Sequence, residues 1–80
     1  MNLSFTIGIY PASGENQFIE KEVELNSPNL DEIKALFNLA DDHEFSDMYP
    51  ISKEQSFYFA KNFKVEFDFE KYQYFFEAHL

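Results

Sequence analysis

The chain has 80 residues, the size of one small domain, so we expect a single domain over residues 1–80. Six lysines, no arginine and fifteen acidic residues give a formal net charge of −9, with a sequence pI near 4.4. This charge argues against direct binding of nucleic acid or of an anionic membrane and predicts a basic partner. Eleven Phe and five Tyr can still build a core in so short a chain, which argues against disorder.

The chain contains no cysteine. This excludes a disulfide framework, a thiolate zinc site and a cysteine nucleophile, and it is typical of proteins in a reducing compartment. We therefore expect a cytoplasmic protein. The first residues offer neither a basic region nor a long apolar run, so we predict no signal peptide and no membrane span.

The first half of the chain predicts a hairpin followed by a helix. Residues 3–10 alternate apolar and polar side chains, as a strand with one buried face does. Turn-forming residues at 11–16 separate this strand from a second, less regular alternating run over 18–25. Asn29 can cap a helix whose apolar residues repeat at helical spacing and which is predicted to end near Ala40.

The second half predicts a loop, a short element and two strands. Residues 41–49 are rich in acids and show no period, which is typical of a loop. Residues 53–61 follow a capping-box pattern and favour a helix that turns Phe57 and Ala60 inward, although the strand propensity of the aromatic residues leaves a strand open. The most regular alternation, over 63–69, predicts a strand, and residues 72–78 predict a last strand antiparallel to it.

Together these elements predict an α+β fold. The simplest arrangement is an antiparallel sheet of about four strands with one or two helices packed on one face.

The sequence offers little for catalysis. Gly8 and Gly14 are the only glycines and form no phosphate-binding loop, and the lack of arginine removes the usual clamp for anionic substrates. His43 lies among acids, but the spacing matches no calcium loop and supplies a single imidazole, so we interpret this segment as a solvated acidic loop. His79 is expected to be exposed and uninvolved. We therefore predict a protein that is not an enzyme and that holds no cofactor and no metal.

The acidic residues are concentrated in three segments. Two of them alternate along predicted strands, over residues 20–24 and 66–70, and the third fills the predicted loop. A charge run is usually a solvated face, but −9 exceeds the magnitude of ~2–8 that keeps a small domain soluble. The excess predicts a partner that supplies cations. We predict that the partner-binding residues are Asp41, Asp42, Glu44, Asp47, Glu66, Asp68 and Glu70.

Two segments resemble motifs of a known family. Tyr49-Pro50-Ile51-Ser52, followed by Gln55, and the ending Tyr72-Gln73-Tyr74-Phe75-Phe76-Glu77 are similar to segments of small acidic bacterial immunity proteins, which belong to contact-dependent growth inhibition and related toxin systems. Phe76 stands where that family more usually has leucine. The resemblance covers roughly the second half of the chain and the predicted helix that begins at Leu30, and it supports a class of protein without indicating a site.

The resemblance implies a protein that binds and neutralises a cognate basic toxin domain, most simply a nuclease acting on RNA or DNA. Two alternatives stay open. One is a nucleic-acid mimic that inhibits a DNA-binding regulator or a host nuclease, and the other is a non-catalytic structural subunit that self-associates. The sequence leaves the oligomeric state open. Binding through carboxylates should weaken with salt, whereas apolar self-association should not.

Overall fold

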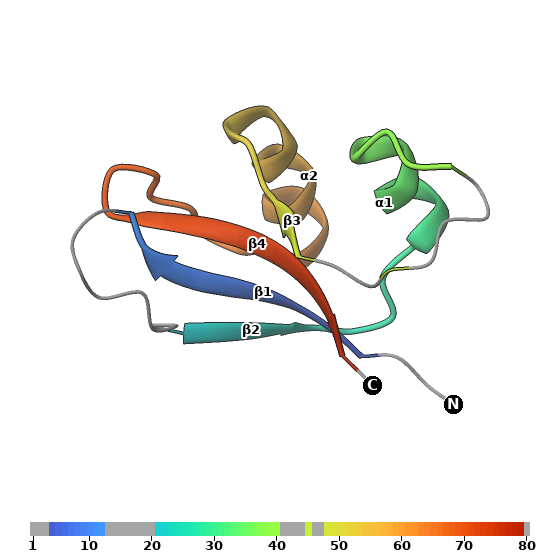
Figure 1. The fold of residues 1–80 in the computed structure, drawn as a ribbon, viewed down its shortest axis with the longest axis horizontal. Coiled ribbons are helices and arrows are strands. Elements are labelled where there is room, and N and C mark those ends of the chain that lie inside the picture. Colours follow the sequence, from blue (N-terminus) through green and yellow to red (C-terminus); the bar gives the residue numbers. More distant parts are fainter. Residues whose placement is uncertain (1–3, 13–20, 41–44, 46–47, 80) are drawn as a thin grey trace.

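The computed structural model describes residues 4–12, 21–40, 45 and 48–79. Its elements are, in chain order, β1 (Ser4–Pro11), β2 (Lys21–Leu25), α1 (Leu30–Leu36), β3 (Tyr49–Pro50), α2 (Lys53–Phe63) and β4 (Tyr72–His79). The strands form one four-stranded antiparallel sheet in the order β2-β1-β4-β3. Both helices lie on the same face of this sheet (Figure 1). The predicted α+β fold is confirmed.

The core lies between the sheet and the helices. Apolar residues of β1 alternate toward the helices, so that Ile7 pairs with Val23 on one side and with Phe76 on the other. Phe76 is fully buried, and its ring centroid lies between 5.5 and 6.4 Å from those of five neighbours. These neighbours are Phe5, Phe37, Phe45, Tyr49 and Phe59. Aromatic packing of this kind gives a short chain a large buried apolar area.

Both helices begin at the polar caps that the sequence marks. Asn29 Oδ1 accepts a hydrogen bond from the backbone N–H of Glu32 at 3.1 Å. At the start of α2, Ser52 Oγ accepts from the N–H of Gln55 at 3.1 Å, and Gln55 Oε1 accepts from the N–H of Ser52 at 2.9 Å. This complete capping box satisfies two backbone donors. Residues 53–61 are thus helical, which the sequence had left open.

Helix α1 is shorter than predicted, since it ends at Leu36 and not near Ala40. Asn38 adopts the left-handed conformation, with φ of 59°. The N–H of Leu39 then donates to the carbonyl of Lys34 at 2.7 Å. This is the closure that ends many helices, and asparagine is one of the few residues that tolerate it.

The side of helix α2 that faces the core differs from the predicted one. Phe57 is 66% exposed and Ala60 is exposed, whereas Phe59 is fully buried. Ser56 shares the buried side, and its hydroxyl donates to the carbonyl of Lys53 at 2.6 Å. Because its hydroxyl is hydrogen-bonded to the backbone, Ser56 can be buried among apolar residues. The positions of apolar residues alone therefore predict the wrong buried side for this helix.

The strand predicted over residues 63–69 is wrong. Helix α2 continues through Phe63, and Lys64 ends it in the left-handed conformation, with φ of 56°. The following residues form a loop and a turn, in which the carbonyl of Asp68 accepts from the N–H of Tyr72 at 2.9 Å. In this loop Val65 is buried, and Phe67 and Phe69 are half-buried. The alternation of apolar and polar residues therefore reflects packing of every second side chain onto the core, without pairing to a strand.

Strand β4 was predicted to pair with a strand over residues 63–69, and its neighbours are therefore different. It pairs with β1 along its whole length and with the two residues of β3 on its other side. The sequence placed Tyr49 at the end of a loop and predicted no strand there. Proline cannot donate to a ladder and is therefore confined mostly to edge strands, which is where β3 lies.

Candidate functional site

The candidate site lies on the face of the sheet that no described helix covers (Figure 1). We call this the open face. In the register of the sheet, Thr6 lies between Glu24 and Glu77, and Gly8 lies between Glu22 and Phe75. Because successive side chains of a strand point to opposite faces, these residues share one face. The open face thus consists of Ser4, Thr6, Gly8 and Tyr10 on β1, Glu22 and Glu24 on β2, Pro50 on β3, and Gln73, Phe75, Glu77 and His79 on β4.

A buried carboxylate lies near the middle of this face. The side chain of Glu77 is only 8% exposed, although it points away from the helices. It reaches over Gly8, where a Cβ atom would lie 2.5 Å from Glu77 Oε2. Glycine inside a strand often marks the close approach of another group. Here it makes room for the carboxylate.

Tyr10 holds one oxygen of this carboxylate. Its hydroxyl donates to Glu77 Oε2 at 2.7 Å. Burial raises the pKa of the Tyr10 phenol to about 12, and the hydrogen bond to Glu77 and the negative charges of Glu77 and Glu22 act in the same direction. The phenol therefore remains a hydrogen-bond donor throughout the neutral pH range.

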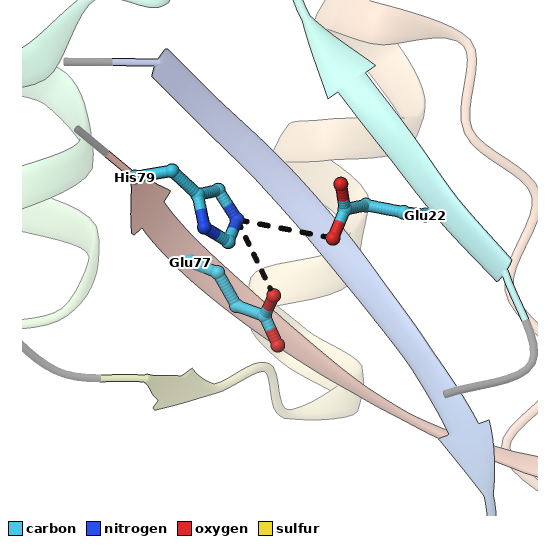
Figure 2. Close-up of side chains that lie close together, drawn as sticks. All are labelled: Glu22, Glu77 and His79. Carbon is cyan, nitrogen blue, oxygen red and sulfur yellow. Dashed lines mark ion pairs between the residues drawn. The ribbon is translucent and has the colours of Figure 1, made fainter. Parts of the chain in front are cut away.

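A histidine and a second carboxylate complete the arrangement. His79 Nε2 lies 3.6 Å from Glu77 Oε1 and 3.8 Å from Glu22 Oε2. Figure 2 shows the imidazole directed at both carboxylates. The same nitrogen lies 2.9 Å from Thr6 Oγ1. We call Glu22, Glu77 and His79 the Glu-Glu-His cluster; one ligand atom from each lies within 4.8 Å of the other two.

Strand β1 allows the cluster to form across itself. Glu22 comes from β2 and the other two members come from β4, on opposite sides of β1. The β1 residues between them on this face are Thr6 and Gly8, which are too small to separate the longer side chains. A shallow cleft of about 430 Å³ lies beside the cluster and is lined by Ser4, Thr6, Glu22, Glu24 and His79. Two carboxylates and an imidazole can hold a proton or a cation.

The structure describes only three of the predicted partner-binding residues, and these three lie away from the open face. Asp41, Asp42, Glu44 and Asp47 lie outside the described residues. Glu66, Asp68 and Glu70 are exposed in the loop and turn after α2, so they are not on a strand as predicted. The side chain of Asp68 also accepts from the N–H of Glu70 at 3.2 Å, which makes it part of its own turn.

Two of these loop acids border a groove between β2 and the loop. This groove, of about 730 Å³, opens on the helix side of the sheet, since Ile9 and Val23 of its lining face that side. Glu66 and Asp68 share it with two lysines, so its charge is mixed. The lysines are Lys21 and Lys64.

Sequence reasoning missed the Glu-Glu-His cluster. Glu77 was named only as the end of a motif, and His79 was expected to be exposed and uninvolved, whereas His79 contacts both carboxylates and Thr6. One signal was present, because Gly8 lies inside the first predicted strand and glycine there suggests close approach of another group. Which group approaches depends on the pairing of β1 with β4, which the sequence does not specify.

Comparison with known protein families adds one match. The model of a family described as "Domain of unknown function (DUF7683)" matches residues 7–77. The chain belongs to this family. The DUF7683 match includes most of β1 and β4 and all of β2, and therefore most of the open face. No curated protein and no solved structure matches the chain.

Within the described residues, neither α1 nor α2 has the length and apolar character needed to cross a membrane.

Proposed function

We propose that this protein is a non-catalytic, acidic binding module of the immunity-protein kind, which captures a basic protein through the open face. The observation that carries the proposal is the charge of that face. Glu22, Glu24 and Glu77 lie there on β2 and β4, and no lysine lies among the described residues of the face. A surface of one sign steers a partner of the opposite sign and raises its association rate.

The lysines lie on the other side or away from the sheet. Lys21 belongs to β2 but pairs with Ile9 on the side that faces the helices. The others lie on the helices, at the end of α2 and in the turn before β4. They are Lys34, Lys53, Lys61, Lys64 and Lys71. The described charges of the protein are therefore distributed unevenly, and the open face carries acids without lysines.

Two aromatic residues give this face contact area as well as charge. Tyr10 and Phe75 are half-buried, and their rings meet edge to face with centroids 5.4 Å apart. Partly exposed aromatic side chains beside polar groups are enriched at protein interfaces.

The partner that we propose is a basic toxin domain, most simply a nuclease, met in the cytoplasm. The resemblance of two segments to immunity proteins supports this choice, and the net charge of −9 supports a basic partner without reference to that resemblance. The acids of residues 41–47 stay part of the proposal as a second contact predicted from the sequence.

The test uses the protein encoded directly upstream of the gene for this chain, which for an immunity protein should be the toxin. We expect a one-to-one complex whose association rate falls steeply between low and high salt. Changing Glu22 and Glu24 together to lysine should slow association about 10-fold or more. The matched control changes Asp31 and Glu54, exposed on the helices, to lysine and alters the net charge equally. Absence of a complex, or equal effects of the two double variants, would overturn the proposal.

The loop contact has a separate test. Asp41, Asp42 and Glu44 are changed together to lysine, and protection of cells against the toxin is measured with the thermal midpoint of the purified protein. We expect protection to be lost while the midpoint stays nearly constant. Unchanged protection would remove the loop from the proposed interface and leave the open face as the whole of it.

A further inference from the structure

We infer that the Glu-Glu-His cluster is a binding site for a single borderline divalent cation of the Zn²⁺ type. This inference does not depend on the proposed capture of a basic protein, because it concerns the isolated chain. It rests on the spacing of three ligand atoms, on the burial of one carboxylate and on the hydrogen bond that orients that carboxylate.

The spacing of the ligand atoms suits a small cation. His79 Nε2 lies 3.6 Å from Glu77 Oε1 and 3.8 Å from Glu22 Oε2. Tetrahedral ligands bound at the usual distances to Zn²⁺ stand about 3.3–3.5 Å apart. The ligand atoms of the two carboxylates lie within 4.8 Å of each other, so side-chain rotations would bring the three atoms to one ion. Glu22 can supply most of this movement, because its side chain is 47% exposed at the surface of the sheet.

The burial of Glu77 provides an independent reason. Its side chain is more than nine-tenths buried, and Tyr10 satisfies only Oε2. The other oxygen, Oε1, points toward His79, whose Nε2 lies 3.6 Å away. A buried carboxylate is costly unless it is paired or coordinates a metal. The open face offers no described lysine as a counter-charge, so the cation would supply it.

The surroundings of the cluster match those of a metal ligand. Metal-bound carboxylates are usually hydrogen-bonded by an outer residue that fixes their orientation. Tyr10 does this for Glu77, since its hydroxyl donates to Oε2. The other oxygen, Oε1, is directed at His79 (Figure 2). Gly8 contributes the space in which the carboxylate lies. A bound cation would take the place of the hydrogen bond between Thr6 Oγ1 and His79 Nε2.

The ligand set also selects the kind of cation. Imidazole nitrogen suits Zn²⁺ and its transition-metal neighbours, whereas Mg²⁺ and Ca²⁺ prefer oxygen ligands and higher coordination numbers. Three protein ligands would leave a fourth position of Zn²⁺ open to water. The described residues offer no fourth carboxylate or imidazole within the same distance.

The experiment is a calorimetric titration of the full, tag-free chain with ZnCl₂. We expect saturation at one ion per chain and no comparable heat with MgCl₂ or CaCl₂. Loss of an outer hydrogen-bond partner typically weakens metal binding by about 10–100-fold, and Tyr10→Phe should fall within that range. His79→Gln and Glu22→Gln each remove a ligand and should weaken binding by more than this. Glu77→Gln should act like the other ligand changes, and circular dichroism checks that each variant folds.

Two matched controls separate this site from general affinity for cations. His43→Gln removes the other histidine of the chain, and Glu24→Gln removes a neighbouring acid of the open face. Both should leave the affinity within about threefold, which is below the effect of losing an outer partner. The inference is overturned if Zn²⁺ does not saturate at one ion per chain, if His43→Gln weakens binding as much as His79→Gln, or if Glu22→Gln and His79→Gln both leave the affinity unchanged. In each case the cluster is not a site for a single Zn²⁺ ion.

Discussion

The carboxylate of Glu77 occupies the space in which a side chain at position 8 would lie. A Cβ on Gly8 would stand 2.5 Å from Glu77 Oε2 and 2.9 Å from the ring of Tyr10. Since Tyr10 also donates to Glu77, one missing methyl group permits both the burial of the acid and its hydrogen bond. The open face therefore depends on a glycine that contributes no polar group of its own.

Gly8→Ala should destabilise the fold by about 1–3 kcal/mol, because an overpacked site forces neighbouring side chains to move. The urea midpoint measures the change. Ser4→Ala is the control on the same strand and face, and as an exposed position it should stay within about 0.5 kcal/mol of the wild type. A Gly8→Ala protein as stable as the wild type would show that Glu77 does not need this space.

Phe76→Ala should destabilise the protein by about 3–5 kcal/mol, because Phe76 is fully buried among five other rings and the change leaves a cavity. Phe57→Ala is a control of the same chemistry, since Phe57 is 66% exposed on α2. We expect its effect to lie within about 0.5 kcal/mol. Equal losses in the two variants, measured by chemical denaturation, would contradict the assignment of the inner side of α2.

Lys64→Gly should stabilise the protein by about 0.5–1 kcal/mol. Lys64 ends α2 in the left-handed conformation, which glycine adopts without a steric cost. Lys61→Gly, in the last turn of the same helix, should instead destabilise by about 1 kcal/mol, because glycine is a poor residue inside a helix. The two free energies of unfolding should thus change with opposite signs. Destabilisation by both would argue that α2 does not end at Lys64.

Stability should fall as the pH rises from about 10 to about 12. Burial raises the pKa of Tyr10 to about 12, as does its hydrogen bond to Glu77, and burial with a hydrogen bond to Glu32 has the same effect on Tyr58. The native state therefore holds these protons more tightly than the unfolded state, whose tyrosines titrate near 10. The resulting stabilisation is complete below pH 10 and is lost as the pH rises through the folded-state pKa.

Urea midpoints across this alkaline range measure the loss, and absorbance near 295 nm reports the ionised phenols. Tyr10→Phe and Tyr58→Phe should each make the fall shallower, because each removes one shifted group. A slope identical in the wild type and in both variants would show that neither phenol contributes. The change in slope between the wild type and each variant is the quantity that tests the prediction, because all other groups are common to the three proteins.

Local signals in the sequence predicted where helices begin better than they predicted which strands pair. Asn29 and Ser52 mark helix starts because a cap involves only residues three positions apart. The end of α1 was missed, although Asn38 can adopt a positive φ, because the apolar spacing continues beyond it. Residues 63–69 alternate like a strand, but a strand also needs a neighbour, and β1 and β3 are the neighbours of β4.

The Glu-Glu-His cluster was out of reach of sequence analysis for the same reason. Thr6 and His79 are 73 positions apart, and their contact follows from the pairing of β1 with β4. Acid-rich runs are visible in a sequence, whereas the burial of Glu77 is not. This burial depends on the register in which Gly8 pairs with Phe75, which precedes Glu77 by two positions on β4.

The pairing of β1 with β4 also determines when the protein can fold during its synthesis. The two strands lie side by side in the middle of the sheet (Figure 1), yet β4 leaves the ribosome last of all the described elements. Until then Phe5, Ile7 and Ile9 have no Phe76 against which to pack. A nascent chain that stalls before residue 72 would expose these side chains and an unpaired strand edge, which makes it a substrate for chaperones and proteases.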